Sequence, residues 1–315
     1  MLPPDGTSLR AILVFVHGDG ALDRTAHDYY RPIFERLRRA GYASLSWDKP
    51  GVGASTGDWL SQSMADRRDE TRAAIDALRL RSGACPAPIG LFGFSQAGWV
   101  VPGVAADSDD VDFAIGVGFA IDWARQGRFL TETRLRLAGR DDARIDAALA
   151  EHDRRIALYR AGVDRERFVA ELGHETGVPR GPRYGFAVRN VDADASANHE
   201  RLDKPLLVLL GEHDRNVDVR ATARALDAPG VGRANLDLRL LAGATHSMLH
   251  VDEFDVQSPG LGWWLRFTWL GEAAFVPEFL DTVETWLDRT VPARRACRTR
   301  SAPREAARRE GGCCP

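Results

Sequence analysis

The sequence predicts an α/β protein with a mostly parallel, doubly wound sheet and an inserted helical segment. Buried strands and helices alternate from the amino terminus to about residue 119. The expected strands are continuous apolar runs such as 11–16, which is typical of strands covered on both faces. The same alternation returns near residue 206, after a long stretch without a strand pattern. Strands that alternate with helices favour a parallel sheet with helices on both sides.

The first half of the chain supplies four of the expected strands. An amphipathic helix follows the first strand and has Gly41 as its stop signal. The expected elements, in order, are strand 11–16, helix 27–39, strand 43–47, helix 64–81, strand 89–92, helix 96–106 and strand 113–119. Ligands of such sheets bind beyond the carboxyl ends of the strands, so the residues that follow each strand are the candidates for function.

Residues 122–201 interrupt this pattern with two or three expected helices and no buried strand. We interpret the segment as a helical cap, inserted over the ligand edge of an α/β core made by 1–121 and 202–291. The alternative is that it covers one side of the core. Its mixed arginine and acidic residues are typical of a solvated face and indicate no partner.

The alternation resumes after the insertion with strand 206–210, helix 220–226, strand 236–241 and a closing helix at about 276–288. A loop at 259–269, before the closing helix, is unusually aromatic. The tail 292–315 is rich in arginine, alanine and glycine with almost no apolar content, which predicts disorder.

The composition excludes several classes of protein. The 315 residues carry a net charge of −3, so no excess of basic residues is present to hold nucleic acid. The amino terminus lacks the pattern of a signal peptide, and no apolar run approaches the ~20 residues of a membrane span. The four cysteines predict neither a disulfide framework nor a zinc site. We expect a cytoplasmic protein without metal or cofactor. Lysine occurs only at Lys49 and Lys204, so arginine supplies nearly all of the positive charge.

The segment around Ser95 has the pattern of a nucleophile elbow. A short buried strand ends at Gly93, and a helix is expected to begin just after Ser95. Small residues let the strand and the helix approach each other, and the serine then takes a strained backbone conformation with its hydroxyl exposed. Ala97 replaces the second glycine of the usual pattern and is followed by Gly98. The alternative is a plain strand–turn–helix junction.

Ser95, Asp214 and His246 are the candidate catalytic residues. A serine hydroxyl needs a base to take its proton, and the base needs an acid that fixes its tautomer. All three residues follow expected strands, in the order serine, acid, histidine. Taken singly, Asp214 could be a helix cap and His246 a surface residue. His250 could also compete for the role of the base.

Two backbone amides are the candidates for an oxyanion hole. Gln96 heads the expected elbow helix, and Asp19 follows His17-Gly18 at the end of the first strand. Donors in these positions can stabilise the charge that develops on a carbonyl oxygen. We expect His17 itself to be a structural residue, since no metal-binding spacing involves it.

These residues together resemble those of the α/β-hydrolase superfamily. Four segments carry the likeness: His17-Gly18, Asp48-x-x-Gly51-x-Gly53-x-Ser55, the Ser95 elbow, and the two late loops with Asp214 and His246. The chain is similar to capped bacterial esterases, acyl-thioesterases and peptidases of the serine aminopeptidase type. It differs from the usual pattern at Pro50, where arginine is common. The family's opening antiparallel strands also have no counterpart, since the first buried strand begins near residue 9.

The resemblance implies a serine-nucleophile enzyme that hydrolyses an ester, thioester or amide of a small-molecule substrate. One alternative is an acyltransferase that moves an acyl group from coenzyme A or an acyl carrier protein to a thiol, hydroxyl or amine. Another is a non-catalytic binding protein on the same fold. Trp263, Trp264 and Trp269 could contact substrate and exclude water, or could simply pack under the cap. No feature of the sequence indicates the oligomeric state.

Overall fold

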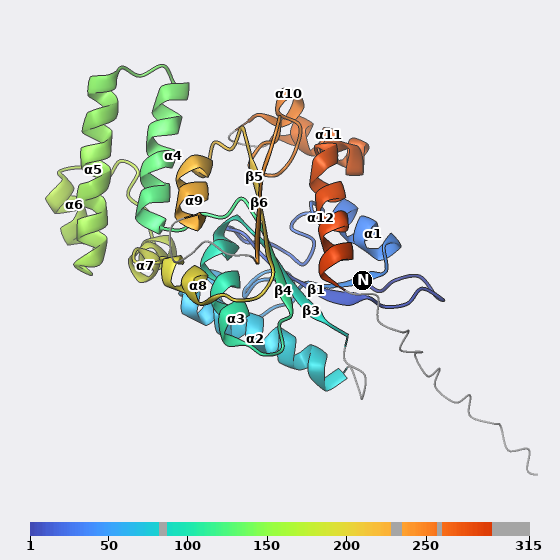
Figure 1. The fold of residues 1–315 in the computed structure, drawn as a ribbon. Coiled ribbons are helices and arrows are strands. Elements are labelled where there is room, and N and C mark those ends of the chain that lie inside the picture. The colour runs from blue at the N-terminus through green and yellow to red at the C-terminus, as the bar shows by residue number, and fades with distance from the viewer. Residues whose placement is uncertain (82–86, 228–234, 257–259, 292–315) are drawn as a thin grey trace, which may run out of the picture.

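The computed structural model describes residues 1–81, 87–227, 235–256 and 260–291. Its six strands form one sheet in the order β2-β1-β3-β4-β5-β6, and every pair of neighbours is parallel (Figure 1). The strands are β1 Ala11–Val16, β2 Tyr42–Leu45, β3 Ile89–Phe94, β4 Phe113–Val117, β5 Leu206–Gly211 and β6 Leu236–Leu241. The predicted α/β fold is therefore confirmed. No antiparallel strand joins this sheet within the described residues.

Helices cover both faces of the sheet. On one face, α1 (Arg31–Arg39) and α12 (Pro277–Thr290) bury apolar side chains against β1, β3 and β4. On the other face, α2 (Met64–Arg81), α3 (Val101–Asp107) and α9 (Val219–Leu226) pack against the alternate residues of the same strands. Strands covered in this way need apolar side chains on both sides, which explains why the burial of β1, β3, β4 and β5 is complete.

Five helices lie between β4 and β5, where two or three were expected. They are α4 Trp123–Leu137, α5 Asp142–Arg160, α6 Arg165–Leu172, α7 Pro182–Asn190 and α8 Ser196–Arg201. The last three are short, so each gives too few turns for a clear helical period. Figure 1 shows α4 and α5 side by side, projecting away from the sheet. We propose that residues 122–201 form a cap on the core made by 1–121 and 202–291.

Two local predictions were wrong. Helix α1 begins at Arg31 and not at residue 27, because Ala26, His27 and Asp28 have positive φ angles of 50°, 55° and 69°. The aromatic segment predicted as a loop is a helix over its described residues, α11 Leu261–Leu270, followed by a short 3₁₀ turn, η3 Gly271–Ala274. Apolar residues occupy both faces of α11, so the sequence shows no amphipathic stripe there.

The remaining described elements are short: η1 Trp59–Ser61, η2 Ser95–Trp99 and α10 Val251–Phe254. None of the described helices is both long and apolar enough to cross a membrane. The predicted disorder of 292–315 and the four cysteines lie outside the described residues.

Candidate active site

Ser95 stands at a sharp turn between β3 and the 3₁₀ turn η2. Its φ angle is +51°, in the left-handed region that residues with a Cβ rarely adopt. Holding a residue other than glycine in this region costs about 1–3 kcal/mol, so the surrounding packing must impose it. The predicted elbow is present, although the helix that follows is in two parts, η2 and then α3.

The small residues around Ser95 are required by close packing. A Cβ added to Gly93 would lie 2.6 Å from Val101 Cγ2 and 2.9 Å from Ala97 Cβ. Ala97 is fully buried. Alanine therefore fits at position 97 because position 93 has no side chain, and the departure from the usual glycine leaves the turn intact.

Asp214 and His246 form a hydrogen-bonded pair at the ends of β5 and β6. The distance from His246 Nδ1 to Asp214 Oδ2 is 2.6 Å, and the Asp214 side chain is completely buried. The other oxygen, Oδ1, accepts the backbone N–H groups of Asn216 (2.7 Å) and Val217 (2.8 Å). These bonds fix the carboxylate, which in turn fixes the imidazole so that Nε2 is the free ring nitrogen.

The surroundings of His246 raise its pKa. Burial works to lower the pKa, but the charge of Asp214 and its hydrogen bond outweigh that effect, so the net shift is upward from 6.5. His250, the competing candidate, precedes α10 and lines a different hollow with Arg36 and Glu272. The structure therefore pairs the acid with His246 and not with His250.

Ser95 follows β3 and His246 follows β6, and β4 and β5 lie between these two strands in the sheet. The imidazole of His246 packs next to Gly118. A Cβ on Gly118, which follows β4, would lie 2.8 Å from His246 Cε1. Within the described residues, no hydrogen bond joins the Ser95 hydroxyl to His246. Such bonds are often long in free enzymes and shorten when substrate binds. The role of the three residues as a triad stays a prediction.

The two predicted oxyanion donors lie close to the Ser95 turn. A Cβ on Gly18 would lie 3.4 Å from Ser95 Cβ, so the segment after β1 packs directly on the elbow. The Gln96 side chain donates to Asp19 Oδ1 at 3.1 Å and joins the two segments. In the described part of the chain, the backbone N–H of Asp19 has no backbone acceptor. Gln96 lies in the first turn of η2, where the N–H groups of a helix have no partner within it. Their role as oxyanion donors stays a prediction.

His17 is a structural residue in this arrangement, as expected. Its Nε2 hydrogen-bonds to the carbonyl oxygen of Trp47 at 2.6 Å. Burial lowers the pKa of His17 to about 3, so the ring is neutral at ordinary pH.

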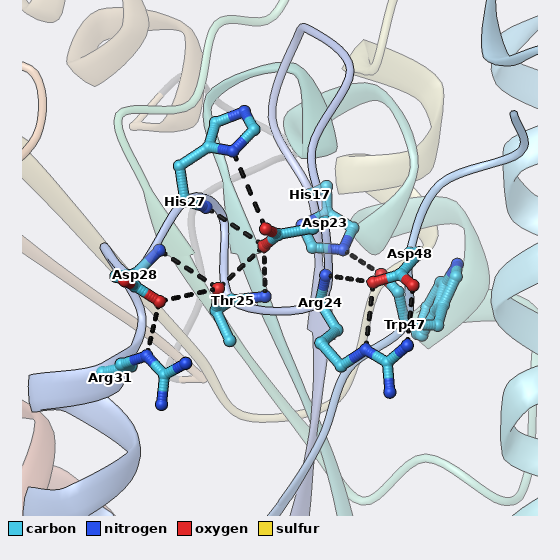
Figure 2. Close-up of polar contacts among 9 residues, drawn as sticks. All are labelled: His17, Asp23, Arg24, Thr25, His27, Asp28, Arg31, Trp47 and Asp48. Atoms are coloured by element: carbon cyan, nitrogen blue, oxygen red, sulfur yellow. Dashed lines mark hydrogen bonds and ion pairs between the residues drawn. The ribbon is translucent and has the colours of Figure 1, made fainter. Parts of the chain in front are cut away.

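Two polar clusters hold the segment between β1 and α1 (Figure 2). Arg24 binds both oxygens of Asp48, and these bonds lower the pKa of Asp48 to about 2. Asp23 accepts from Thr25 and from the backbone of His27, which stabilises the left-handed turn at residues 26–28. These hydrogen bonds therefore hold the segment in place at residues 23–27, just after Asp19.

A pocket of about 170 Å³ opens at Ser95. It is lined by Asp19, Ser95, Gln96, Trp99, Ala120, Trp123, Gln126, Leu130 and Val217. Three of these come from α4, so the inserted helices contribute to the pocket wall. The Trp99 indole donates to Ile121 O at 2.9 Å, which fixes its ring.

The three tryptophans predicted to contact substrate take different places. Trp263 lines a separate hollow of about 120 Å³ that also contains His246. Trp264 packs against the core, and Trp269 is 82% exposed on α11. The structure does not bring Trp264 or Trp269 to the described lining of the Ser95 pocket. Trp99 and Trp123 occupy that place instead.

Four residues near the site were not found from the sequence: Trp99, Trp123, Lys49 and Arg67. The one available signal concerned Lys49, because lysine is so rare in this arginine-rich chain. Among the described residues, no group of three or more histidine, cysteine or acidic side chains could hold a metal ion.

Gly118→Ala is expected to lower kcat/KM about 100-fold. A methyl group at this position would displace the imidazole of His246, and displacements of about 1 Å can cost ~10²-fold in rate. Gly139→Ala is the matched control: Gly139 has a similar φ (+65° against +61°) but nothing within 4 Å of an added Cβ. Assays of serine-dependent catalysis should show the loss only in Gly118→Ala. Equal activities would contradict the placement of His246.

The sequence model of a family described as "Serine aminopeptidase, S33" matches residues 7–253, which is most of the chain. No curated protein matches the sequence.

Several solved structures share the fold. The monoacylglycerol lipase of Paleococcus ferrophilus is 19% identical with a TM-score of 0.55, covering 90% of this chain and 96% of that one. The Pyrococcus furiosus esterase Pf2001 is 18% identical with a TM-score of 0.54, covering 92% and 84%. Est1E from Butyrivibrio proteoclasticus is 15% identical with a TM-score of 0.53, covering 92% of each chain.

Proposed function

The chain belongs to the serine aminopeptidase S33 family of α/β-hydrolases, and on that basis we propose that it hydrolyses a small-molecule ester through an acyl-enzyme on Ser95. The observation that carries the proposal is the 2.6 Å hydrogen bond between His246 and the buried Asp214 carboxylate. Two of the solved structures of similar fold are named as an esterase and a monoacylglycerol lipase, and we extend ester chemistry to this chain from those names.

In the first half-reaction, Ser95 Oγ attacks the acyl carbon and His246 Nε2 takes the hydroxyl proton. The carbonyl π electrons move to the oxygen, whose negative charge is held by the N–H groups of Gln96 and Asp19. When the carbonyl re-forms, the ester C–O bond breaks and the leaving alkoxide takes the proton from His246. Asp214 stabilises the imidazolium throughout.

In the second half-reaction, water attacks the acyl-enzyme and His246 takes one of its protons. The same two N–H groups hold the second oxyanion. Its collapse breaks the bond to Ser95 Oγ, which recovers the proton from His246. The acid product leaves, and the enzyme returns to its starting state.

The Ser95 pocket favours a small, uncharged acyl group. Its wall is mostly apolar, with Trp99, Trp123, Leu130 and Val217 around Ser95. Within the described lining the one charged side chain is Asp19, which also faces Arg183 at 3.5 Å. A volume of about 170 Å³ suits a short acyl chain or a single ring better than a long chain.

A fluorophosphonate probe is expected to label the wild-type protein at Ser95 and to leave Ser95→Ala unlabelled. Phosphonylation requires a serine activated by a base, so a surface serine does not react at a comparable rate. Intact-protein mass spectrometry gives the adduct, and peptide mapping gives its position. Absence of labelling in folded wild-type protein would contradict the proposed nucleophile and favour a non-catalytic role.

The acceptor is tested with a series of p-nitrophenyl esters. We expect steady release of both the phenol and the acid, with highest kcat/KM for short acyl chains. Added thiols, alcohols or amines should leave the rate of acyl-enzyme breakdown unchanged. If these nucleophiles accelerate breakdown and appear in the product, the protein is an acyltransferase.

A further inference from the structure

Two buried basic side chains lie behind the segment that carries Asp19. Lys49 is 1% exposed and Arg67 is 4% exposed. Within the described part of the chain, neither side chain forms an ion pair. Burying a polar or charged group is costly unless it is hydrogen-bonded, so the hydrogen bonds that these groups make must compensate for the loss of water.

Arg67 and Lys49 donate to consecutive carbonyl groups. Arg67 Nη2 donates to His17 O at 2.6 Å, and Lys49 Nζ donates to Gly18 O at 3.1 Å. The other end of the Arg67 guanidinium, Nη1, donates to Gln96 Oε1 at 2.7 Å. The two basic side chains therefore contact both segments of the proposed oxyanion hole from the buried side.

The planarity of the peptide bond connects these contacts with the Asp19 amide. The carbonyl of Gly18 and the N–H of Asp19 belong to one trans peptide unit, in which they point in opposite directions. When Lys49 holds the carbonyl toward the interior, the Asp19 N–H must point away from it. Gly18 packs against the Ser95 turn: a Cβ added to Gly18 would lie 3.4 Å from Ser95 Cβ.

We propose that Lys49 is a positioning residue for the oxyanion hole, which fixes the Gly18–Asp19 peptide so that its N–H faces the substrate oxygen. Arg67 acts beside it on the preceding peptide and on Gln96. The inference rests on the proposed ester hydrolysis at Ser95.

Other contacts already brace the segment, so Lys49 is not needed to hold its general path. Arg24 pairs with Asp48, and the His17 ring hydrogen-bonds to Trp47 O (Figure 2). Lys49 also contacts the Trp59 ring, with Nζ 4.6 Å from the ring centroid. Gly18 O is its one hydrogen-bond acceptor among the described residues.

The protonation state of Lys49 does not decide this role. Burial, and next the charge of Arg67, lowers the pKa of Lys49 to about 6, with Arg183 adding to the shift while Asp19 and Glu70 oppose it. A neutral amine still has N–H groups to donate. The peptide therefore keeps its orientation on both sides of that pKa.

The test compares Lys49→Met with Lys204→Met. Methionine keeps the length and volume of the side chain but has no donor. Lys204, the other lysine, is half-buried and also donates to a backbone carbonyl, that of Ser108, so it matches Lys49 in chemistry. In Lys49→Met we expect kcat to fall about 10- to 100-fold with KM nearly unchanged, less than the ~10²–10³-fold for outright loss of an oxyanion donor. Lys204→Met should keep wild-type kcat.

A second measurement separates positioning from stability. An alkylboronic acid forms a tetrahedral adduct with an active serine, so its affinity depends on the oxyanion hole. Its Kd should rise in Lys49→Met by the same factor as kcat falls. Lys49→Gln keeps an N–H donor and should recover part of both. A lower Tm with kcat and boronate affinity within twofold of wild type would assign Lys49 a purely structural role.

Failure of the Lys49 proposal can be distinguished from failure of the proposed function. If Lys49→Met does not fold, Lys49→Gln carries the test, and unequal changes in kcat and boronate affinity would overturn the inference. If wild-type protein itself shows no Ser95-dependent hydrolysis, the proposed function fails first. If the wild-type protein hydrolyses esters and Lys49→Met does so with unchanged kcat, only the role of Lys49 is contradicted.

Discussion

Replacing Ser95 with alanine is expected to lower kcat by about 10⁶-fold and to leave the fold intact. The loss is this large because the serine, the histidine and the acid act as a unit, and what remains is the contribution of binding and of the oxyanion hole. Steady-state assays with an activated ester, at enzyme concentrations high enough to see the residual rate, give the number. Retention of more than about one hundredth of kcat would mean that another group is the nucleophile.

The same position gives a test of the strained turn. Ser95 has a φ of +51°, which glycine adopts without strain. Ser95→Gly should therefore lose activity like Ser95→Ala but exceed it in the free energy of unfolding by about 1 kcal/mol. Urea denaturation of the two variants measures the difference. If glycine is no more stable than alanine, the turn is not strained.

Asp214→Asn is expected to lower kcat about 10⁴-fold, since the asparagine favours the wrong tautomer of His246 and no longer stabilises its imidazolium. It should also change the pH dependence of kcat/KM. His246 must be neutral to act as a base, so activity in wild type rises as pH increases through its raised pKa, above 6.5. Removing the carboxylate leaves burial, which favours the neutral ring. The rise of kcat/KM with increasing pH, which is the acid limb of the profile, should then occur below pH 6.5 in this variant.

Asp218→Asn is the control for this variant. Asp218 lies four residues further along the same loop and caps α9 by accepting from Ala221 N at 2.8 Å. Asparagine caps helices about as well as aspartate, so stability should hardly change. Neither kcat nor the acid limb should move in this variant. An unshifted acid limb in Asp214→Asn would show that the limb does not report on His246.

Much of the architecture follows from local patterns. All six strands were predicted, those at the centre of the sheet from continuous apolar runs, and α2 coincides with its predicted bounds, because a helix of 18 residues repeats its period several times. The candidates Ser95, Asp214 and His246 could be named for a topological reason. The carboxyl ends of parallel strands share one edge, so residues that follow different strands can meet there.

Local patterns failed where a tertiary contact overrides them. The start of α1 is shifted because Asp23 stabilises a left-handed turn through side-chain bonds that a helical pattern does not reveal. In α11, Trp263 and Phe267 face the core while Leu265 and Trp269 are exposed. With apolar residues on both faces, periodicity could not separate this helix from a loop.

The sequence by itself determined the fold class, the strand order along the chain and the three residues proposed for catalysis. Only the tertiary structure decided that Trp99 and Trp123 line the Ser95 pocket and that Lys49 and Arg67 lie behind the Asp19 segment. The physical reason is that periodicity records which side of an element is buried. It does not record which side chain of another layer fills the space opposite, because that depends on how the packed layers meet in three dimensions.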